Sequence, residues 1–118
     1  MLYTVFFGVI VTKLDKIEMI QLFDLYKGIL TDKQCEMLHL FYECDFSLGE
    51  IAEQYSISRQ AVHDSLSKAE SALLVTEQKL CFYKQNRDIE NLAQEAISTT
   101  NTSDKDTYLQ QIISIVRV

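Results

Sequence analysis

The segment from Ser47 to Leu74 constrains the fold of this chain more than any other part of the sequence. It reads SLGEIAEQYSISRQAVHDSLSKAESALL, a pattern typical of a helix-turn-helix, in which two helices meet at a tight turn. One side of the predicted motif is apolar or small at helical spacing: Ile51, Ala52 and Tyr55 on the first helix, Ile57 in the turn, and Val62 and Leu66 on the second. We expect the helices to cross closely at Ala52.

Local capping signals mark where the two helices begin. Ser47 and Glu50 have the S-x-x-E spacing of a capping box, and Ser58 is a good N-cap for the second helix. Ser56 occupies the turn position where Gly is usual, because the backbone there tends to take a positive φ. We expect Ser56 to adopt that conformation at some cost, or the turn to differ.

Several segments carry a resemblance to known proteins. They are Leu30–Gln34, Phe41–Tyr42, Ser47–Val62, Glu77–Leu80 and Tyr108–Leu109. The core of the motif resembles the last DNA-binding region of bacterial sigma factors. The wider chain, about residues 13–116, is similar to the YlxM family of helix-turn-helix proteins. That resemblance implies a part in the signal recognition particle pathway, through the particle's GTPase or RNA, because the family's genes neighbour that of the GTPase.

Composition and periodicity predict an all-α fold. The chain has 118 residues, no Pro and three Gly, which is the size of a single domain, here expected over residues 13–118. Besides the helix-turn-helix, apolar spacing predicts helices over residues 13–28 and 32–43, with Thr31 and Gln34 as a second capping box. The second motif helix should continue to about residue 84. Two amphipathic helices, near residues 89–97 and 108–116, should flank a polar linker at residues 98–104.

Residues 1–12 form an uncharged, apolar N-terminal extension. They are too few to span a bilayer, which needs about 20 residues, and they lack the features of a signal peptide. Our interpretation is a misassigned start codon, with Val11 as the true start. The alternative is an arm that packs on the core or lies on a membrane surface.

The cysteines indicate a cytoplasmic protein with reduced thiols. Cys35, Cys44 and Cys81 are odd in number and have no C-x-x-C spacing. Cys35 and His39 lie one helical turn apart with Cys44 nearby, but a zinc site needs a fourth ligand, so we expect no metal. The sequence also lacks phosphate-binding loops and hydrolase motifs. We therefore expect neither a cofactor nor an enzyme.

The exposed side of the second motif helix is the predicted nucleic-acid contact. Its residues are Arg59, Gln60, His63, Ser67 and Lys68. Arg pairs well with guanine and Gln with adenine in the major groove, although a solvated polar surface is the simpler alternative. The net charge is −6, and the motif itself carries two basic and four acidic side chains. We therefore expect weak binding of DNA or RNA.

A heptad-like stripe runs along the second motif helix at steps of four and three. It comprises Val62, Leu66, Ala69, Leu73, Thr76, Leu80 and Tyr83. The C-terminal helices could cover its distal part, or a second copy could. We predict a homodimer with Leu73, Leu80 and Tyr83 at the interface.

The leading function hypothesis is a dimeric DNA-binding regulator. The alternative is an accessory protein of the signal recognition particle that does not bind DNA and whose acidic surface suits a basic protein partner.

Overall fold

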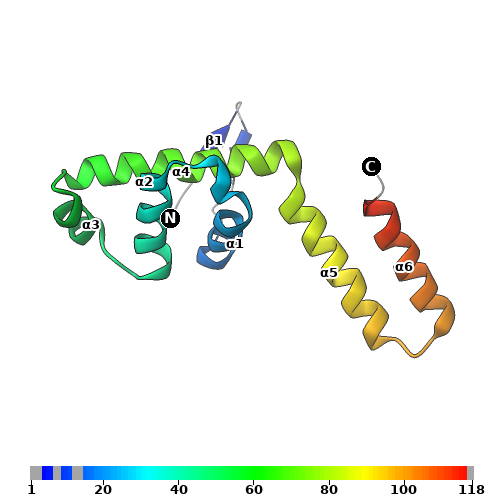
Figure 1. The fold of residues 1–118 in the computed structure, drawn as a ribbon. Helices are drawn as coiled ribbons and strands as arrows, with labels where there is room; N and C mark the ends of the chain where they lie inside the picture. The colour runs from blue at the N-terminus through cyan, green and yellow to red at the C-terminus, as the bar shows by residue number, and fades with distance from the viewer. Residues whose placement is uncertain (1–3, 7–8, 12–14, 117–118) are drawn as a thin grey trace. The chain divides into compact units, whose positions relative to one another are not determined.

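A computed structural model of the chain describes residues 4–6, 9–11 and 15–116 (Figure 1). The chain divides into two compact units, Met1–Leu80 and Cys81–Val118. In the described ranges, no helix has both the length and the apolar character needed to cross a membrane.

The first unit begins with a two-stranded antiparallel hairpin. Strand β1 (Thr4–Phe6) pairs with β2 (Val9–Val11), with Thr4 opposite Val11 and Phe6 opposite Val9. The pairing falls in the apolar segment 1–12, which is rich in the β-branched residues that favour strands.

Helix α1 (Lys16–Tyr26) follows and continues into a 3-10 turn, η1 (Lys27–Ile29). Its first turn is capped by Asp15, whose Oδ1 accepts the Glu18 N–H at 2.8 Å. Its buried residues are Met19, Leu22, Phe23 and Tyr26, whereas Ile17 and Ile29 are exposed. Apolar residues lie on more than one side of α1, so the core takes only some of them.

Helix α2 (Asp32–Leu38) begins at the predicted capping box and ends earlier than predicted. Thr31 Oγ1 accepts the Gln34 N–H at 3.2 Å, and Gln34 Oε1 accepts the Thr31 N–H at 3.0 Å. The chain then takes one turn of π-helix, η2 (His39–Glu43). The wider turn rotates the residues after Leu38, so that Tyr42 is buried and Phe41 is only half-buried.

The helix-turn-helix prediction is confirmed. Helix α3 (Leu48–Tyr55) and helix α4 (Arg59–Leu80) meet at Ser56, which has φ 55° and ψ 43° and so takes the left-handed conformation. The capping serines accept hydrogen bonds: Ser47 Oγ from the Glu50 N–H at 3.1 Å, and Ser58 Oγ from the Ala61 N–H at 3.0 Å. The Ser47 hydroxyl also donates to Glu50 Oε1 at 3.2 Å.

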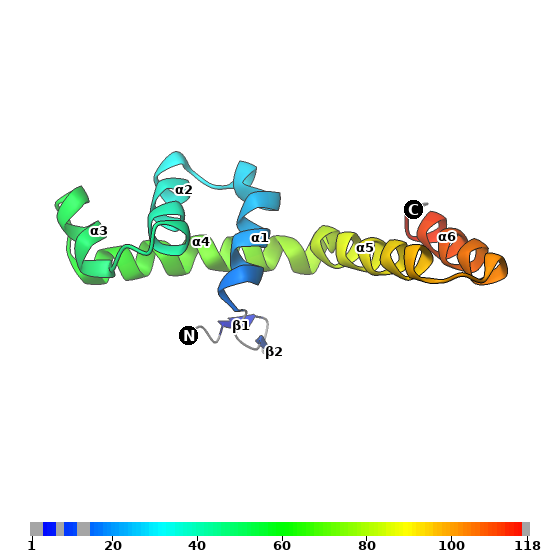
Figure 2. The same ribbon diagram turned by 90° about the horizontal axis from the view of Figure 1, so that it is seen from below.

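Helix α4 is the element on which the first unit packs. Figure 2 shows α3 at its start, α2 next to it and α1 further along, and all three contact α4. The core is formed by Met37, Leu38, Ile51, Val62, Ala69 and Leu73, each fully buried, together with the buried residues of α1. The first four positions of the predicted heptad stripe therefore belong to this core.

One polar pair lies within the core. Tyr42 Oη donates a hydrogen bond of 2.7 Å to Glu70 Oε1, and both residues are buried. Burial raises the pKa of the Glu70 carboxyl, and the Tyr42 hydrogen bond opposes that rise. Burial, with the neighbouring Glu70 charge, also raises the pKa of the Tyr42 hydroxyl.

The second unit is a helical hairpin. Helix α4 ends at Leu80, not near residue 84 as predicted, because Cys81 takes a left-handed conformation with φ 58°. Helix α5 (Phe82–Ser98) packs against helix α6 (Thr102–Val116). Asn101 Oδ1 accepts the Ser103 N–H at 2.9 Å and caps α6, so the linker is shorter than predicted. Apart from β1 and β2, the described chain is helices and turns, as the all-α prediction required.

Candidate nucleic-acid interface

The first turns of α4 present polar side chains on the side away from the core. Arg59, Gln60, His63 and Lys68 are exposed, and Ser67 is half-buried. On the same helix Val62 and Leu66 are buried. All five residues predicted to contact nucleic acid thus belong to the part of α4 that the fold leaves accessible. We call Arg59, Gln60, His63, Ser67 and Lys68 the recognition face.

Arg59 lies beside the start of α3. A Cβ added at Gly49 would be 3.9 Å from Arg59 Cδ and Nε, an ordinary van der Waals distance. The guanidinium therefore sits between the beginnings of the two motif helices. The amide N–H groups of a helix's first turn have no partner within the helix and favour anions. An Arg at this place adds a full positive charge and a planar donor that suits phosphate or guanine.

Sequence reasoning missed Asp64, which organises the middle of the recognition face. Gln60 Nε2 donates to Asp64 Oδ1 at 2.9 Å, and His63 Nδ1 lies 3.6 Å from the same oxygen. The carboxylate accepts one of the two N–H donors of the Gln60 side-chain amide. It also places a negative charge beside Gln60 and His63. The i, i+4 spacing of Gln60 and Asp64 was the available signal.

The residues predicted for a dimer interface have different surroundings. Leu73 is fully buried within the single chain, so it cannot meet a second copy without unfolding. This part of the interface prediction was wrong, because α1 packs along the distal half of α4 and the prediction allowed only for the C-terminal helices. Leu80 is 46% exposed, and Tyr83 is half-buried with the Arg87 guanidinium 5.7 Å from its ring centroid.

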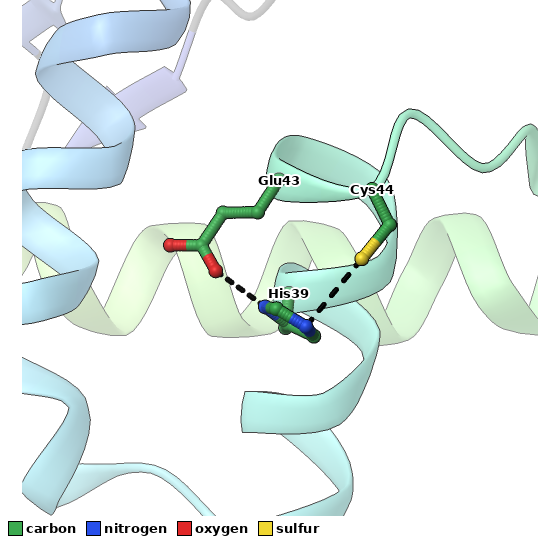
Figure 3. A network of polar contacts seen from close by, with 3 residues as sticks. All are labelled: His39, Glu43 and Cys44. Carbon is green, nitrogen blue, oxygen red and sulfur yellow. Dashed lines mark hydrogen bonds and ion pairs between the residues drawn. The ribbon is translucent and has the colours of Figure 1, made fainter.

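A second polar cluster, formed by His39, Glu43 and Cys44, lies at the π-turn (Figure 3). His39 lies between two partners: Nδ1 contacts Glu43 Oε2, and Nε2 is 3.4 Å from Cys44 Sγ. The π-turn creates this arrangement by placing residues 39 and 44 one turn apart, with the Cys44 N–H bonded to His39 O at 3.1 Å. A thiol beside an imidazole that a carboxylate orients is the arrangement that activates cysteine nucleophiles.

The Cys35 thiol does not join this cluster. It donates to Lys27 O at 3.5 Å, so Cys35, His39 and Cys44 do not converge on one point. Over the described residues, no group of three or more His, Cys, Asp or Glu side chains is placed to hold a metal ion.

A family model described as "Putative helix-turn-helix protein, YlxM / p13 like" matches residues 13–114. The chain belongs to this family. A family member from Halalkalibacterium halodurans is 41% identical over 96 residues, which cover 78% of this chain and 88% of that protein. The protein YlxM of Bacillus subtilis is 41% identical over 91 residues, covering 75% and 83%. A relative from Thermoanaerobacter is 47% identical over 77 residues, covering 65% and 66%. The family is one of helix-turn-helix proteins.

Proposed function

We propose that this protein binds nucleic acid through the first turns of α4, as a regulatory helix-turn-helix protein. The observation that carries the proposal is the contrast between the two sides of α4. Val62 and Leu66 are buried against the other helices, whereas Arg59, Gln60 and His63 are exposed. The second helix of such a motif enters the major groove with its N-terminal residues toward the bases.

Charge limits the affinity that this surface can reach. The first unit carries seven basic and twelve acidic side chains, a net charge of −5. Because phosphate neutralisation supplies most non-specific affinity, binding should be weak without a preferred sequence. Arg59 and Lys68 are the two full positive charges on the recognition face, and Asp64 opposes them.

Fluorescence anisotropy with a pool of random-sequence DNA duplexes, and with total cellular RNA, tests the proposal. Arg59→Ala should weaken binding several-fold, since it removes one of the two full positive charges of the recognition face that can neutralise phosphate. Asp64→Asn should strengthen binding several-fold, because it removes a negative charge and keeps an acceptor for Gln60.

Lys79→Ala is the matched control, because it removes a positive charge at the far, exposed end of the same helix. Equal affinities for wild type, Arg59→Ala and Asp64→Asn would refute the recognition face as the binding site.

A second candidate is an accessory protein that contacts the signal recognition particle without binding DNA. The acidic balance of the first unit favours it, since a negative surface suits a basic protein partner. Purified particle GTPase and purified particle RNA should be tested separately. Binding to the GTPase alone, unchanged by Arg59→Ala, would favour this candidate over the first.

A further inference from the structure

Helix α6 carries two apolar stripes, and the hairpin covers only one of them. Tyr108, Ile112 and Ile115 form the first stripe and are half-buried, as expected of residues that pack on α5. Leu109, Ile113 and Val116 form the second stripe at steps of four and three. They are 51%, 46% and 65% exposed. Steps of four and three place all three residues on one side of the helix.

The second unit lacks a core that would hold it together alone. In the described part of Cys81–Val118, neither α5 nor α6 contains a fully buried side chain. A unit of 38 residues is below the size at which a single chain usually folds without a disulfide, a metal or oligomerisation.

We propose that Leu109, Ile113 and Val116, the α6 stripe, are the surface through which two copies of this chain associate. Two α6 helices would pair along their stripes around a two-fold axis, which is the commonest symmetry of homo-oligomers. This pairing does not depend on nucleic-acid binding.

Exposed area supports a dimer of ordinary size. Phe82 and Ile97 of α5 are also exposed, at 47% and 76%. Together with the α6 stripe, these two side chains bring the exposed apolar area of the two helices to about 500 Å². Each partner in a standard interface buries roughly 800 Å², and somewhat more than half of that is non-polar. The hairpin therefore carries about the apolar area that one half of such an interface needs.

Charge favours a second copy as the occupant. The second unit has four basic and five acidic side chains, a net charge of −1, whereas the first unit has −5. Two copies that meet through their second units bring together the parts of the chain that repel each other least. A hairpin without its own core needs a partner whenever the chain is present. A second copy of the same chain meets that need, because it is always made together with the first.

Sedimentation of the full chain at tens of micromolar tests the proposal. The wild-type mass should be twice the 13.6 kDa of one chain. Ile113→Glu should raise the dimer dissociation constant at least about 100-fold, because it buries a charge in an apolar seam. Gln111→Glu adds the same charge on the opposite side of α6 and should leave the dimer intact. A single-chain mass for the wild type, or an unchanged dimer for Ile113→Glu, would overturn the proposal.

A cross-linking variant covers the case in which Ile113→Glu fails to fold. Ile113 is the middle residue of the α6 stripe, so it meets its own copy whether the two helices run parallel or antiparallel. In a chain whose three cysteines are replaced by Ser, Ile113→Cys should form a disulfide-linked dimer on mild oxidation, and Gln111→Cys should not. Equal cross-linking of the two variants would exclude the α6 stripe as the contact.

Discussion

At the scale of single residues, neighbouring side chains decide what each polar group can do. Gln60 was predicted from the sequence as a base-reading residue, yet its amide is held by Asp64. Leu73 was predicted at a dimer interface and is a core residue. The sequence shows which residue types are present at which helical spacing. It does not show which of several neighbouring groups a flexible side chain will contact, because the free energies of the alternative contacts differ by about 1 kcal/mol or less.

The Cys44 thiol, which directly follows η2, should be more reactive than the Cys35 thiol of α2. Cys44 is exposed, its Sγ lies 3.4 Å from His39 Nε2, and Glu43 contacts the other ring nitrogen of His39. Cys35 is half-buried and donates to Lys27 O. We expect iodoacetamide to alkylate Cys44 faster than Cys35, and His39→Gln to slow Cys44 several-fold without changing Cys35. Peptide mass spectrometry measures both rates in one sample. If His39→Gln leaves the Cys44 rate unaltered, the cluster does not activate the thiol.

Glu70 should make the first unit less stable at neutral pH than in mild acid. Burial raises the pKa of its carboxyl in the folded state. The stabilising contribution of the protonated form is therefore complete below the unfolded pKa of about 4.3. It is lost as the pH rises through the folded pKa. Glu70→Gln keeps an acceptor for Tyr42 and removes the charge.

Urea unfolding measures the effect of Glu70→Gln at several pH values. At pH 7.5 the variant should be more stable than wild type by on the order of 1 kcal/mol, and the difference should vanish toward pH 4. The control Glu53→Gln alters an exposed carboxyl on α3 and should show no such trend. A destabilised Glu70→Gln protein at pH 7.5 would contradict the argument.

At the scale of elements, capping residues were the most reliable signals. Thr31, Ser47 and Ser58 begin helices where the sequence predicted, because each cap depends only on residues within one turn. Helix ends were less predictable. The π-turn after Leu38 and the break at Cys81 have no Gly or Pro to mark them. Local propensity therefore could not have located them.

The turn of the helix-turn-helix offers a direct test of local strain. Ser56 holds a left-handed conformation that costs a residue with a Cβ some energy. Ser56→Gly should therefore stabilise the first unit by about 0.5–1 kcal/mol. Thermal unfolding measures the change. Ser58→Gly serves as the comparison. Ser58 does not have a positive φ, so this substitution removes the N-cap of α4 without relieving backbone strain. A lower melting temperature for Ser56→Gly would show that the serine side chain contributes more than the strain costs.

At the scale of the whole molecule, the sequence predicted the first unit better than the second. In the helix-turn-helix, the apolar residues lie on a single side of each helix, so their spacing alone predicts the core. In α6, apolar residues follow two overlapping patterns, one through Tyr108, Ile112 and Ile115 and one through Leu109, Ile113 and Val116. Both patterns were visible in the sequence. Only the structure shows that α5 covers the first and leaves the second exposed.

The two units should unfold separately. The first has a core of fully buried side chains, whereas α5 and α6 contain none. If dimer formation stabilises the folded second unit, its melting temperature should rise with protein concentration, because mass action favours the folded dimer. Hydrogen exchange should then show residues 82–116 exchanging sooner on tenfold dilution, while α2 and α4 keep their protection. Ile113→Glu should abolish that concentration dependence by exposing the hairpin at every concentration. Uniform exchange in both units, independent of dilution, would mean that the hairpin draws its stability from within its own chain.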